Sequence, residues 1–288
     1  YHAYAQGYHT LGRQTLIDPV EWTADGWVKL RHDARPLPAQ DPEKHGLELS
    51  DDFTGKQLGL QWTFWKEYAP ESLSFGKDGM SVKAKGKTPA DGRLLMVTAT
   101  DKNYELTTEI TLGKGNTGGL LLFYDEKAYA GVASDGKTFT IYRNGEKTET
   151  MPSDYHKHFH LRLLNRANRV ILSASKDGKS WEELATDIDV SGLHHNNGFY
   201  ALRPALLSAG KGRTTFRNFT YRDVTPQEKD MAAYLMVFHQ DEDHCLHAAI
   251  SRDGYTFTAL NDGKPIIAGD TIADQKGIRD RTAASTWP

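Results

Sequence analysis

Short runs of aromatic and β-branched residues alternate with Gly, Asn and Asp turns along most of the chain. This spacing is typical of β-strands, and the patterns of long amphipathic helices are almost absent. Asp135-Gly136, Asn144-Gly145 and Asp177-Gly178 separate some of the runs, and Gly there supplies a positive φ at low cost. The pattern predicts antiparallel strands, of which the clearest span 94–100, 104–112, 118–124, 128–134, 138–143, 158–165, 169–176 and 214–221.

Two polar, proline-containing segments, 33–46 and 223–231, divide the chain. Proline among charged residues cannot continue a sheet, so we interpret both as exposed linkers. The unit between them, 47–222, has the size of a whole β-sandwich, whereas the flanks 1–32 and 232–280 are too short to be domains. The predicted fold class is all-β, an antiparallel β-sandwich with short flanking β-segments.

Composition narrows the choice of partner. The 288 residues are 38% hydrophobic, which can supply a core, and the net charge of −3 gives no reason to expect a nucleic acid or an acidic membrane. A neutral ligand is easier to accommodate. Cys245 is the single cysteine, so an intrachain disulfide is excluded, and no stretch approaches the roughly 18 apolar residues of a membrane span. The chain begins at Tyr1 without a signal peptide, and we expect the true N-terminus to be missing.

Histidines form two polar clusters. His156, His158 and His160 alternate and can present imidazoles to a metal from one face of a strand. Without a carboxylate or cysteine partner, a solvent-facing stripe is the favoured interpretation. A second cluster, which a hydrated loop explains better than a cation site, consists of His239, Asp241, Glu242, Asp243 and His244.

Two further groups remain open between binding and structure. Asp51 and Asp52 can help to hold a structural calcium ion, although an Asp pair at the start of a strand is also ordinary turn chemistry. Aromatic side chains that can stack on sugar rings, but that near strands are mostly core, are Trp62, Trp65, Tyr68 and Trp181.

The opening segment carries a resemblance to a known family. Leu11-Gly-Arg-Gln-Thr15, then Pro19-Val-Glu-Trp22 and Asp25-Gly-Trp27, resemble the closing blade of the five-bladed catalytic propeller of glycoside hydrolase family 43. In its β-xylosidase branch the arginine of this stretch reaches the sugar bound at the cleaved end, which implies a substrate-binding role for Arg13. The alternative is a solvated arginine that pairs with Asp18 or Glu21.

The middle unit, 47–222, resembles the concanavalin- or jelly-roll-like sandwich that follows the propeller in the same β-xylosidases. The similarity implies that it packs on a propeller and can wall off one side of the active-site pocket, and it carries no catalytic motif. The segments that match are Asp51-Asp-Phe53, Gln61-Trp62, Gly118-Gly-Leu-Leu-Leu-Phe-Tyr124 and Thr214-Thr-Phe-Arg-Asn-Phe-Thr-Tyr-Arg222.

The last segment, 232–280, is similar to the first blade of another family 43 propeller. Gly277-Ile-Arg-Asp280 matches the stretch that carries the catalytic general base, which implies that role for Asp280; without the match it would be a turn or surface carboxylate. Arg281 stands where the family has proline, and the tail 281–288 matches nothing. The simplest parent is a tandem enzyme with two modules, of which this chain samples the junction.

The resemblance implies an inverting glycoside hydrolase, a β-xylosidase or α-L-arabinofuranosidase acting on xylan, arabinoxylan or arabinan. Inversion needs a base and an acid about 6.5–9.5 Å apart. Only the position of the base is represented, so we expect the isolated chain to be inactive or weakly active. No cofactor is implied beyond the possible calcium, and a secreted or periplasmic parent is expected. The alternative is a non-catalytic sandwich that binds carbohydrate or only buttresses propellers.

Overall fold

The computed structural model describes residues 2–3, 9–15, 20–30, 48–194, 198, 200–226, 233–240 and 242–269. It divides into two compact units, Tyr1–Thr225 and Pro226–Pro288, which we consider separately. The division falls inside the segment 223–231, and the other predicted linker, 33–46, lies outside the described residues. The described elements are β-strands and short 3-10 helices, so the predicted all-β class is confirmed. No helix in the described part of the chain is long and apolar enough to cross a membrane.

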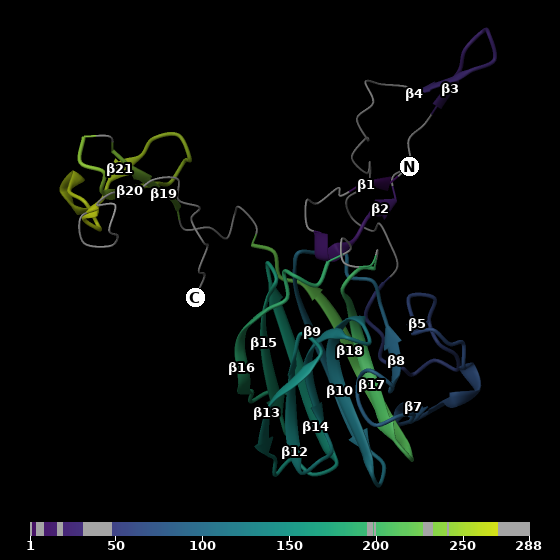
Figure 1. Ribbon diagram of the computed structural model, residues 1–288. Coiled ribbons are helices and arrows are strands. Elements are labelled where there is room, and N and C mark those ends of the chain that lie inside the picture. The colour runs from purple at the N-terminus through teal and green to yellow at the C-terminus, as the bar shows by residue number, and fades with distance from the viewer. Residues whose placement is uncertain are drawn as a thin grey trace. The chain divides into compact units, whose positions relative to one another are not determined.

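Two antiparallel sheets of seven strands each form a sandwich in the first unit (Figure 1). In spatial order, the first sheet consists of β13 (Glu146–Pro152), β12 (Thr138–Arg143), β11 (Ala128–Ser134), β10 (Asn116–Asp125), β17 (Arg203–Gly210), β8 (Arg93–Met96) and β5 (Thr63–Phe64). The second sheet consists of β16 (Glu182–Asp189), β15 (Arg169–Ser175), β14 (His158–Arg166), β9 (Asn103–Leu112), β18 (Arg213–Asp223), β7 (Gly79–Lys83) and β6 (Leu73–Gly76), the last preceded by η2 (Pro70–Ser72).

All eight predicted strands are present. Most differ from the prediction by one or two residues, but β8 stops at Met96, short of the predicted end at Thr100. Beyond Met96 only the Val97 N–H still bonds across, to the carbonyl oxygen of Pro204. The strands β5, β6, β7, β13, β16 and β17 are not among these eight.

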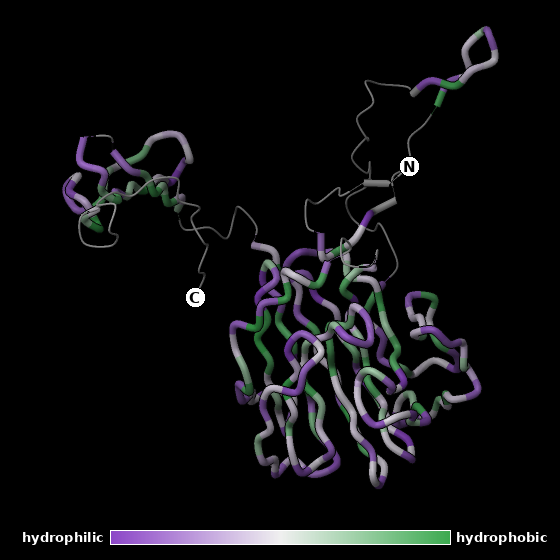
Figure 2. The backbone as a smooth tube through the Cα atoms, viewed as in Figure 1, coloured by the Kyte–Doolittle hydropathy of each residue, from purple (hydrophilic) through white to green (hydrophobic). Residues whose placement is uncertain are grey.

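The second sheet follows the alternation that the sequence predicts. Along β9 and β14 nearly every second side chain is buried, because one face packs on the first sheet and the other meets solvent. Figure 2 shows the hydrophobic stretches along these central strands. The buried side chains join those of the first sheet in one core, here called the inner cluster, which includes Leu106, Phe159, Leu161, Leu120 and Leu122.

The first sheet is buried on both faces at its centre. All residues from Gly118 to Tyr124 in β10 are buried, and a second set of side chains lies on the face away from the inner cluster. This outer cluster consists of Leu94, Met96, Leu121, Phe123, Tyr129, Ala133, Ala205, Leu207 and Ala209. A Cβ at Gly92 would lie 2.5 Å from Leu207 Cδ1, so the loop before β8 packs directly on this face and only glycine fits there.

The Asp-Gly turns have the conformation that was predicted. Gly136, Gly145 and Gly178 all have positive φ, at 84°, 81° and 71°. In the last of these turns Asp177 Oδ1 accepts the backbone N–H groups of Lys179 and Ser180, each at 2.8 Å. These bonds fix the turn, and hence the register between β15 and β16, through the backbone.

Two strand pairs lie before the sandwich in the chain: β1 (His2–Ala3) with β2 (Gln14–Thr15), and β3 (Val20–Trp22) with β4 (Val28–Leu30). Trp22 and Trp27, on the second hairpin, are 77% and 72% exposed. Two tryptophans with this much exposed surface give the hairpin an apolar area open to solvent, which is unusual for a part of a protein that is packed on all sides.

The second unit contains a three-stranded antiparallel sheet of β19 (Tyr234–His239), β20 (Leu246–Ser251) and β21 (Thr258–Ala259), followed by η5 (Asn261–Gly263). His247 and Ala249 are buried, whereas Leu235 is 63% exposed and Ile250 is 40% exposed. The turn after β20 repeats the hydrogen bonds of the turn after β15: Asp253 Oδ1 accepts the N–H groups of residues 255 and 256 at 2.9 and 2.8 Å.

Candidate functional site

The segment that contains Arg13 is anchored to the sandwich. Leu11, in η1 (His9–Leu11), is 7% exposed and belongs to the inner cluster. Thr10 makes two bonds: its carbonyl oxygen accepts the N–H of Leu202 at 2.8 Å, and its hydroxyl donates to Asn168 Oδ1 at 2.8 Å. Residues 10 and 11 are therefore held by the sandwich core and by polar contacts with two of its loops.

Gly12 sets the approach of this segment. Its φ is +72°, and a Cβ on it would lie 3.0 Å from the Cβ of Ala201. Positive φ and a close neighbour both favour glycine, which explains why glycine precedes Arg13. Arg13 follows as an exposed residue. Its backbone is thus fixed beside Ala201, at the end of the sandwich where β17 begins.

Of the two predicted site residues, the structure describes only Arg13. Asp280 and its neighbours 277–279 lie outside the described residues, as does the tail 281–288. Arg13 belongs to the first compact unit and Asp280 to the second. For the alternative role of Arg13, Asp18 also lies outside the described residues, and Glu21 is 3.6 Å from Lys29 across its own hairpin.

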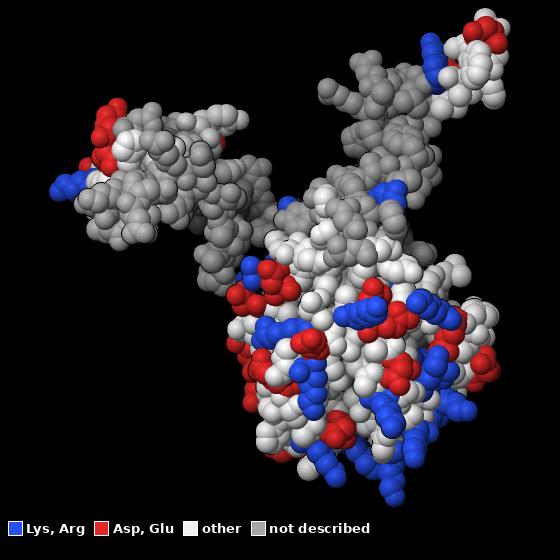
Figure 3. Space-filling view, in the orientation of Figure 1, with Lys and Arg blue, Asp and Glu red and all other residues white. Residues whose placement is uncertain are grey.

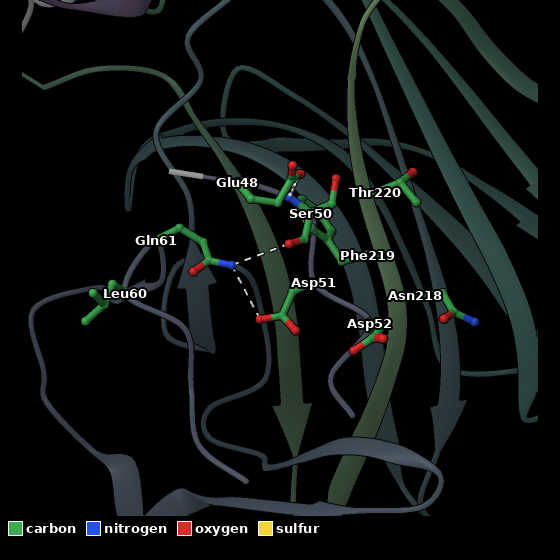
Figure 4. A pocket seen from close by; sticks show the side chains of 9 residues that line it. All are labelled: Glu48, Ser50, Asp51, Asp52, Leu60, Gln61, Asn218, Phe219 and Thr220. Atoms are coloured by element: carbon green, nitrogen blue, oxygen red, sulfur yellow. Dashed lines mark hydrogen bonds between the residues drawn. The ribbon is translucent and has the colours of Figure 1, made fainter. Parts of the chain in front are cut away.

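A shallow acidic pocket of about 640 Å³ opens beside the bridge between Asp51 and Phe219 (Figure 4). Asp51 uses both carboxylate oxygens inside the protein. Oδ1 accepts the N–H of Phe53 at 2.8 Å, and Oδ2 accepts the indole N–H of Trp62 at 3.0 Å and a long bond of 3.5 Å from Gln61. The lining is completed by Glu48, Ser50, Asp52, Leu60, Asn218 and Thr220.

These contacts make Asp51 and Asp52 turn residues. Asp52 Oδ1 accepts both the N–H and the hydroxyl of Thr54, at 2.9 and 2.7 Å, and the backbone bond is the main reason why the pKa of Asp52 is lowered. Calcium takes about six to eight oxygen ligands. The described residues contain no group of three or more His, Cys, Asp or Glu side chains placed to hold a metal. The calcium site stays a prediction.

The first histidine cluster lies on the solvent side of the second sheet. His158 Nδ1 is 3.0 Å from the Thr111 hydroxyl, and its Nε2 is 3.7 Å from Glu109. His160 is half-buried, and burial lowers the pKa of its imidazole. His156 precedes β14 in a turn, with φ of 57°, so the three imidazoles do not share one strand face as the alternation suggested.

In the second unit, Asp243 of the other cluster bonds to two residues outside that cluster. Asp243 Oδ1 accepts the N–H of Cys245 at 2.9 Å, and Oδ2 lies 2.9 Å from Nε2 of His247. The imidazole of His247 is buried and stacks on Phe238. Asp243 thus orders the β19–β20 turn, while Asp241 lies outside the described residues.

Residues 50–204, more than half of the chain, match the model of the β-xylosidase C-terminal concanavalin A-like domain. The chain belongs to this domain family of glycoside hydrolase family 43. The predicted resemblance of the middle unit is thereby confirmed.

Relatives of the family 43 chain include the non-reducing end α-L-arabinofuranosidase BoGH43B of Bacteroides ovatus, which is 36% identical over 85 residues, 27% of this chain and 16% of that protein. Among solved structures, the family 43 protein BlXynB of Bacillus licheniformis gives a TM-score of 0.61 at 21% identity and covers 75% of this chain and 48% of its own. A xylan β-1,4-xylosidase of Bacillus halodurans gives 0.59 at 20% identity, with 77% and 49% covered. These structures support the fold, and the chain spans about half of their length.

The aromatic side chains of the family 43 sandwich divide into core and surface. Trp62 is core, packed between Phe53 and Phe219. Tyr68 is 84% exposed. Trp181 is half-buried under the guanidinium of an arginine, 4.6 Å from the ring centroid.

Trp65 is neither a core residue nor a fully exposed one, so neither of its two predicted roles, sugar stacking or core packing, describes it completely. It is half-buried, donates its indole N–H to Glu126 at 2.8 Å, and lies 5.1 Å from the guanidinium of Arg203. The sequence analysis did not single out Arg203. The available signal was its position: a charged residue that opens the apolar run 204–209, on a strand that is otherwise buried on both faces.

Proposed function

We propose that the chain is the junction region of an inverting glycoside hydrolase that releases pentoses from xylan, arabinoxylan or arabinan. The observation that carries this proposal is the docking of residues 9–13, because the sandwich core and Ala201 fix the backbone of the arginine that the family resemblance assigns to sugar binding. The printed names of its relatives, an arabinofuranosidase and a xylosidase, support pentosides as the substrate class.

The surface of the sandwich carries charges of both signs (Figure 3). Over most of the visible face Lys and Arg are interspersed with Asp and Glu, whereas basic side chains gather along its lower rim (Figure 3). Hydroxyl groups of a sugar are recognised by hydrogen bonds, and the five N–H groups of an arginine such as Arg13 are suitable donors.

The exposed side chains of the flanks support an incomplete site. Trp22 and Trp27 in the first flank, and Leu235 and Ile250 in the last, expose apolar surface that a finished propeller would bury between blades. We assign the general base to Asp280, which would activate a water on one face of the sugar. The acid would protonate the leaving oxygen from the other face, and it would come from blades beyond this chain.

The remaining parts of the proposal follow from the parent enzyme. It would act outside the cytoplasm, secreted or in the periplasm, and need no cofactor for the hydrolysis itself. Calcium, if it binds, would do so beside Asp51 and Asp52 and serve the sandwich.

Release of 4-nitrophenol from aryl β-xylosides and aryl α-L-arabinofuranosides tests the proposal. We expect no turnover by the 288-residue chain and turnover by a longer protein that includes both adjoining coding regions. NMR of the first product of the longer protein should show the inverted anomer, and Arg13→Ala should reduce kcat/KM more than Arg13→Lys. Turnover by the short chain that is lost in Asp280→Ala would refute the incomplete site, and a retained anomer would refute inversion.

A carbohydrate-binding sandwich is the second candidate. The observation that favours it is the pair of exposed tyrosines beside β5 and β17, Tyr68 at 84% and Tyr200 at 40%. Binding of neutral xylo-oligosaccharides by the chain, with no hydrolysis by any longer form, would favour this candidate over the enzyme.

A further inference from the structure

Arg203 stands at the edge of the outer cluster. It is the first residue of β17, opposite Phe123 of β10, and it shares a strand face with Ala205, Leu207 and Ala209 of that cluster. Its guanidinium lies over two aromatic rings, 5.1 Å from the centroid of Trp65 and 5.9 Å from that of Tyr200. The charge is therefore held at the end of an apolar face, among aromatic rings.

Two nitrogens of this guanidinium, Nε and Nη2, are buried and have no hydrogen-bond partner in the described part of the chain. Other arginines of the sandwich differ. Arg93 donates to Glu67 at 2.9 Å, and Nη2 of Arg213 donates to two backbone carbonyls and a serine hydroxyl. A buried cation that lacks acceptors is costly, and contact with aromatic faces offsets only part of that cost.

No nearby acid of the described residues supplies the missing acceptor. Glu126 is engaged: its Oε1 accepts the indole N–H of Trp65 and forms an ion pair with Lys66, each at 2.8 Å. Burial lowers the pKa of Arg203, and no described carboxylate acts against that shift. Arginine nevertheless stays protonated in proteins. The site thus has a positive charge with unused donors.

The unused atoms define the chemistry of a ligand. Nε–H and Nη2–H lie on the same edge of the planar group and point in parallel, which is the edge that binds a carboxylate through two hydrogen bonds. The neighbouring Tyr200 is 40% exposed and can offer a face to a sugar ring. A ligand that carries both a carboxylate and a sugar ring would use both features.

We propose that Arg203, Trp65 and Tyr200 form a binding site for a hexuronate, the acidic sugar of a charged polysaccharide chain. The carboxylate would pair with the Nε–Nη2 edge of Arg203 and the ring would lie against Tyr200. The need for an acceptor with two oxygens follows from the geometry, and the choice of a sugar carboxylate rests on the proposed function. Because both nitrogens are buried, a ligand would reach them only when a neighbouring side chain moves; the backbone N–H of Tyr200 donates to the Tyr124 hydroxyl at 3.3 Å.

The site lies at the same end of the sandwich as Arg13. The N–H of Leu202, next to Arg203, donates to the carbonyl oxygen of Thr10, and Gly12 contacts Ala201. A polysaccharide whose neutral residue reaches Arg13 therefore passes the end of β17, where an acidic substituent can meet Arg203.

Titration of the full 288-residue chain with methyl β-D-glucuronide, followed by NMR chemical shifts at low salt, tests the proposal. Its methyl ester, methyl β-xyloside and acetate are the comparison probes. We expect the glucuronide to cause saturable chemical-shift changes of the Trp65 indole N–H. The ester should bind at least about tenfold more weakly, because the charge-assisted pair is lost. Binding of the glucuronide should also weaken as salt rises. Equal affinity for acetate would overturn the sugar contact, and absence of glucuronide binding would overturn the site.

Arg203→Gln should weaken glucuronide binding at least about tenfold. The matched control is Arg162→Gln, because Arg162 also covers a tryptophan, at 4.6 Å, but its Nη2 has an acceptor in Ser173. The control should leave binding unchanged. Arg203→Leu should lose binding without lowering the thermal midpoint, since it removes an uncompensated buried charge. A lowered midpoint together with unchanged glucuronide binding would make Arg203 a structural residue and overturn the proposal. Neither test depends on hydrolysis, so a failure of the proposed enzyme activity and a failure of the proposed binding site can be told apart.

Discussion

Leu11→Ala tests whether the segment of Arg13 is part of the sandwich fold. Leu11 is 7% exposed and packs in the inner cluster. In the sequence, residues 12–47 separate it from the described part of the sandwich, which begins at residue 48. Removal of a buried leucine side chain costs about 2–5 kcal/mol of unfolding free energy. Because this site is near one end of the core and can partly collapse, we expect about 2–3 kcal/mol.

A loss of this size should lower the thermal midpoint of the first unit by about 4–12 °C. The matched control is Leu60→Ala, because Leu60 is 88% exposed and its removal should change stability by no more than about 0.5 kcal/mol. Hydrogen exchange at the Leu202 amide, which bonds to Thr10, gives a local readout of docking and should become faster in Leu11→Ala. If both variants melt alike and the Leu202 amide keeps its protection, the segment does not depend on the core and the positioning argument for Arg13 is refuted.

Three further changes test other parts of the structure. Gly12→Ala should destabilise the first unit by about 1–2 kcal/mol in urea unfolding, since it forces a side chain to positive φ and against Ala201; no change would contradict the close approach. Asp51→Ala leaves the buried indole N–H of Trp62 without its acceptor and should cost about 1–3 kcal/mol, with a changed near-ultraviolet dichroism. Asp177→Asn should lower the free energy of unfolding at neutral pH but not at low pH. The backbone N–H groups of Ser180 and Lys179 hold the pKa of Asp177 well below its ordinary value. The greater stability of the wild type is therefore present above about pH 4 and falls as the pH drops below it. An advantage that is constant from pH 6 to about pH 2 would refute that account.

The central strands of the second sheet could be predicted from the sequence because one face of these strands meets solvent. In β9 and β14 the alternation of Leu106, Phe159 and Leu161 with polar residues marks both the strand and its buried side. Asp177-Gly178 marks the turn after β15. In the first sheet β17 was not predicted, because it is buried on both faces and its run of small and apolar residues has no period of two. The edge strand β13, with charged and exposed positions throughout, has the opposite difficulty.

The site could be predicted only where a residue is tied to a short local motif. Arg13 was found by the stretch around it, and the structure adds the reason for Gly12 in that stretch. Arg203 has no motif. Its importance depends on Trp65, which is 138 positions earlier in the sequence numbering, and on the absence of an acceptor, a property of the packed structure and not of the residue. Sequence patterns report what a side chain is, whereas an unsatisfied donor is a fact about its neighbours.

The contacts that anchor residues 10 and 11 bear on the sugar-binding role proposed for Arg13. Thr10 bonds to Leu202, just before β17, and Leu11 packs in the inner cluster, so the residues directly before Arg13 are held by the buried part of the fold. A sugar-binding residue on an unsupported loop would lose entropy on binding, whereas one fixed to a packed core has lost it on folding. The sandwich therefore contributes preorganisation. This contribution needs no catalytic carboxylate of its own, and it predicts that damage to the core near Leu11 affects substrate affinity as well as stability.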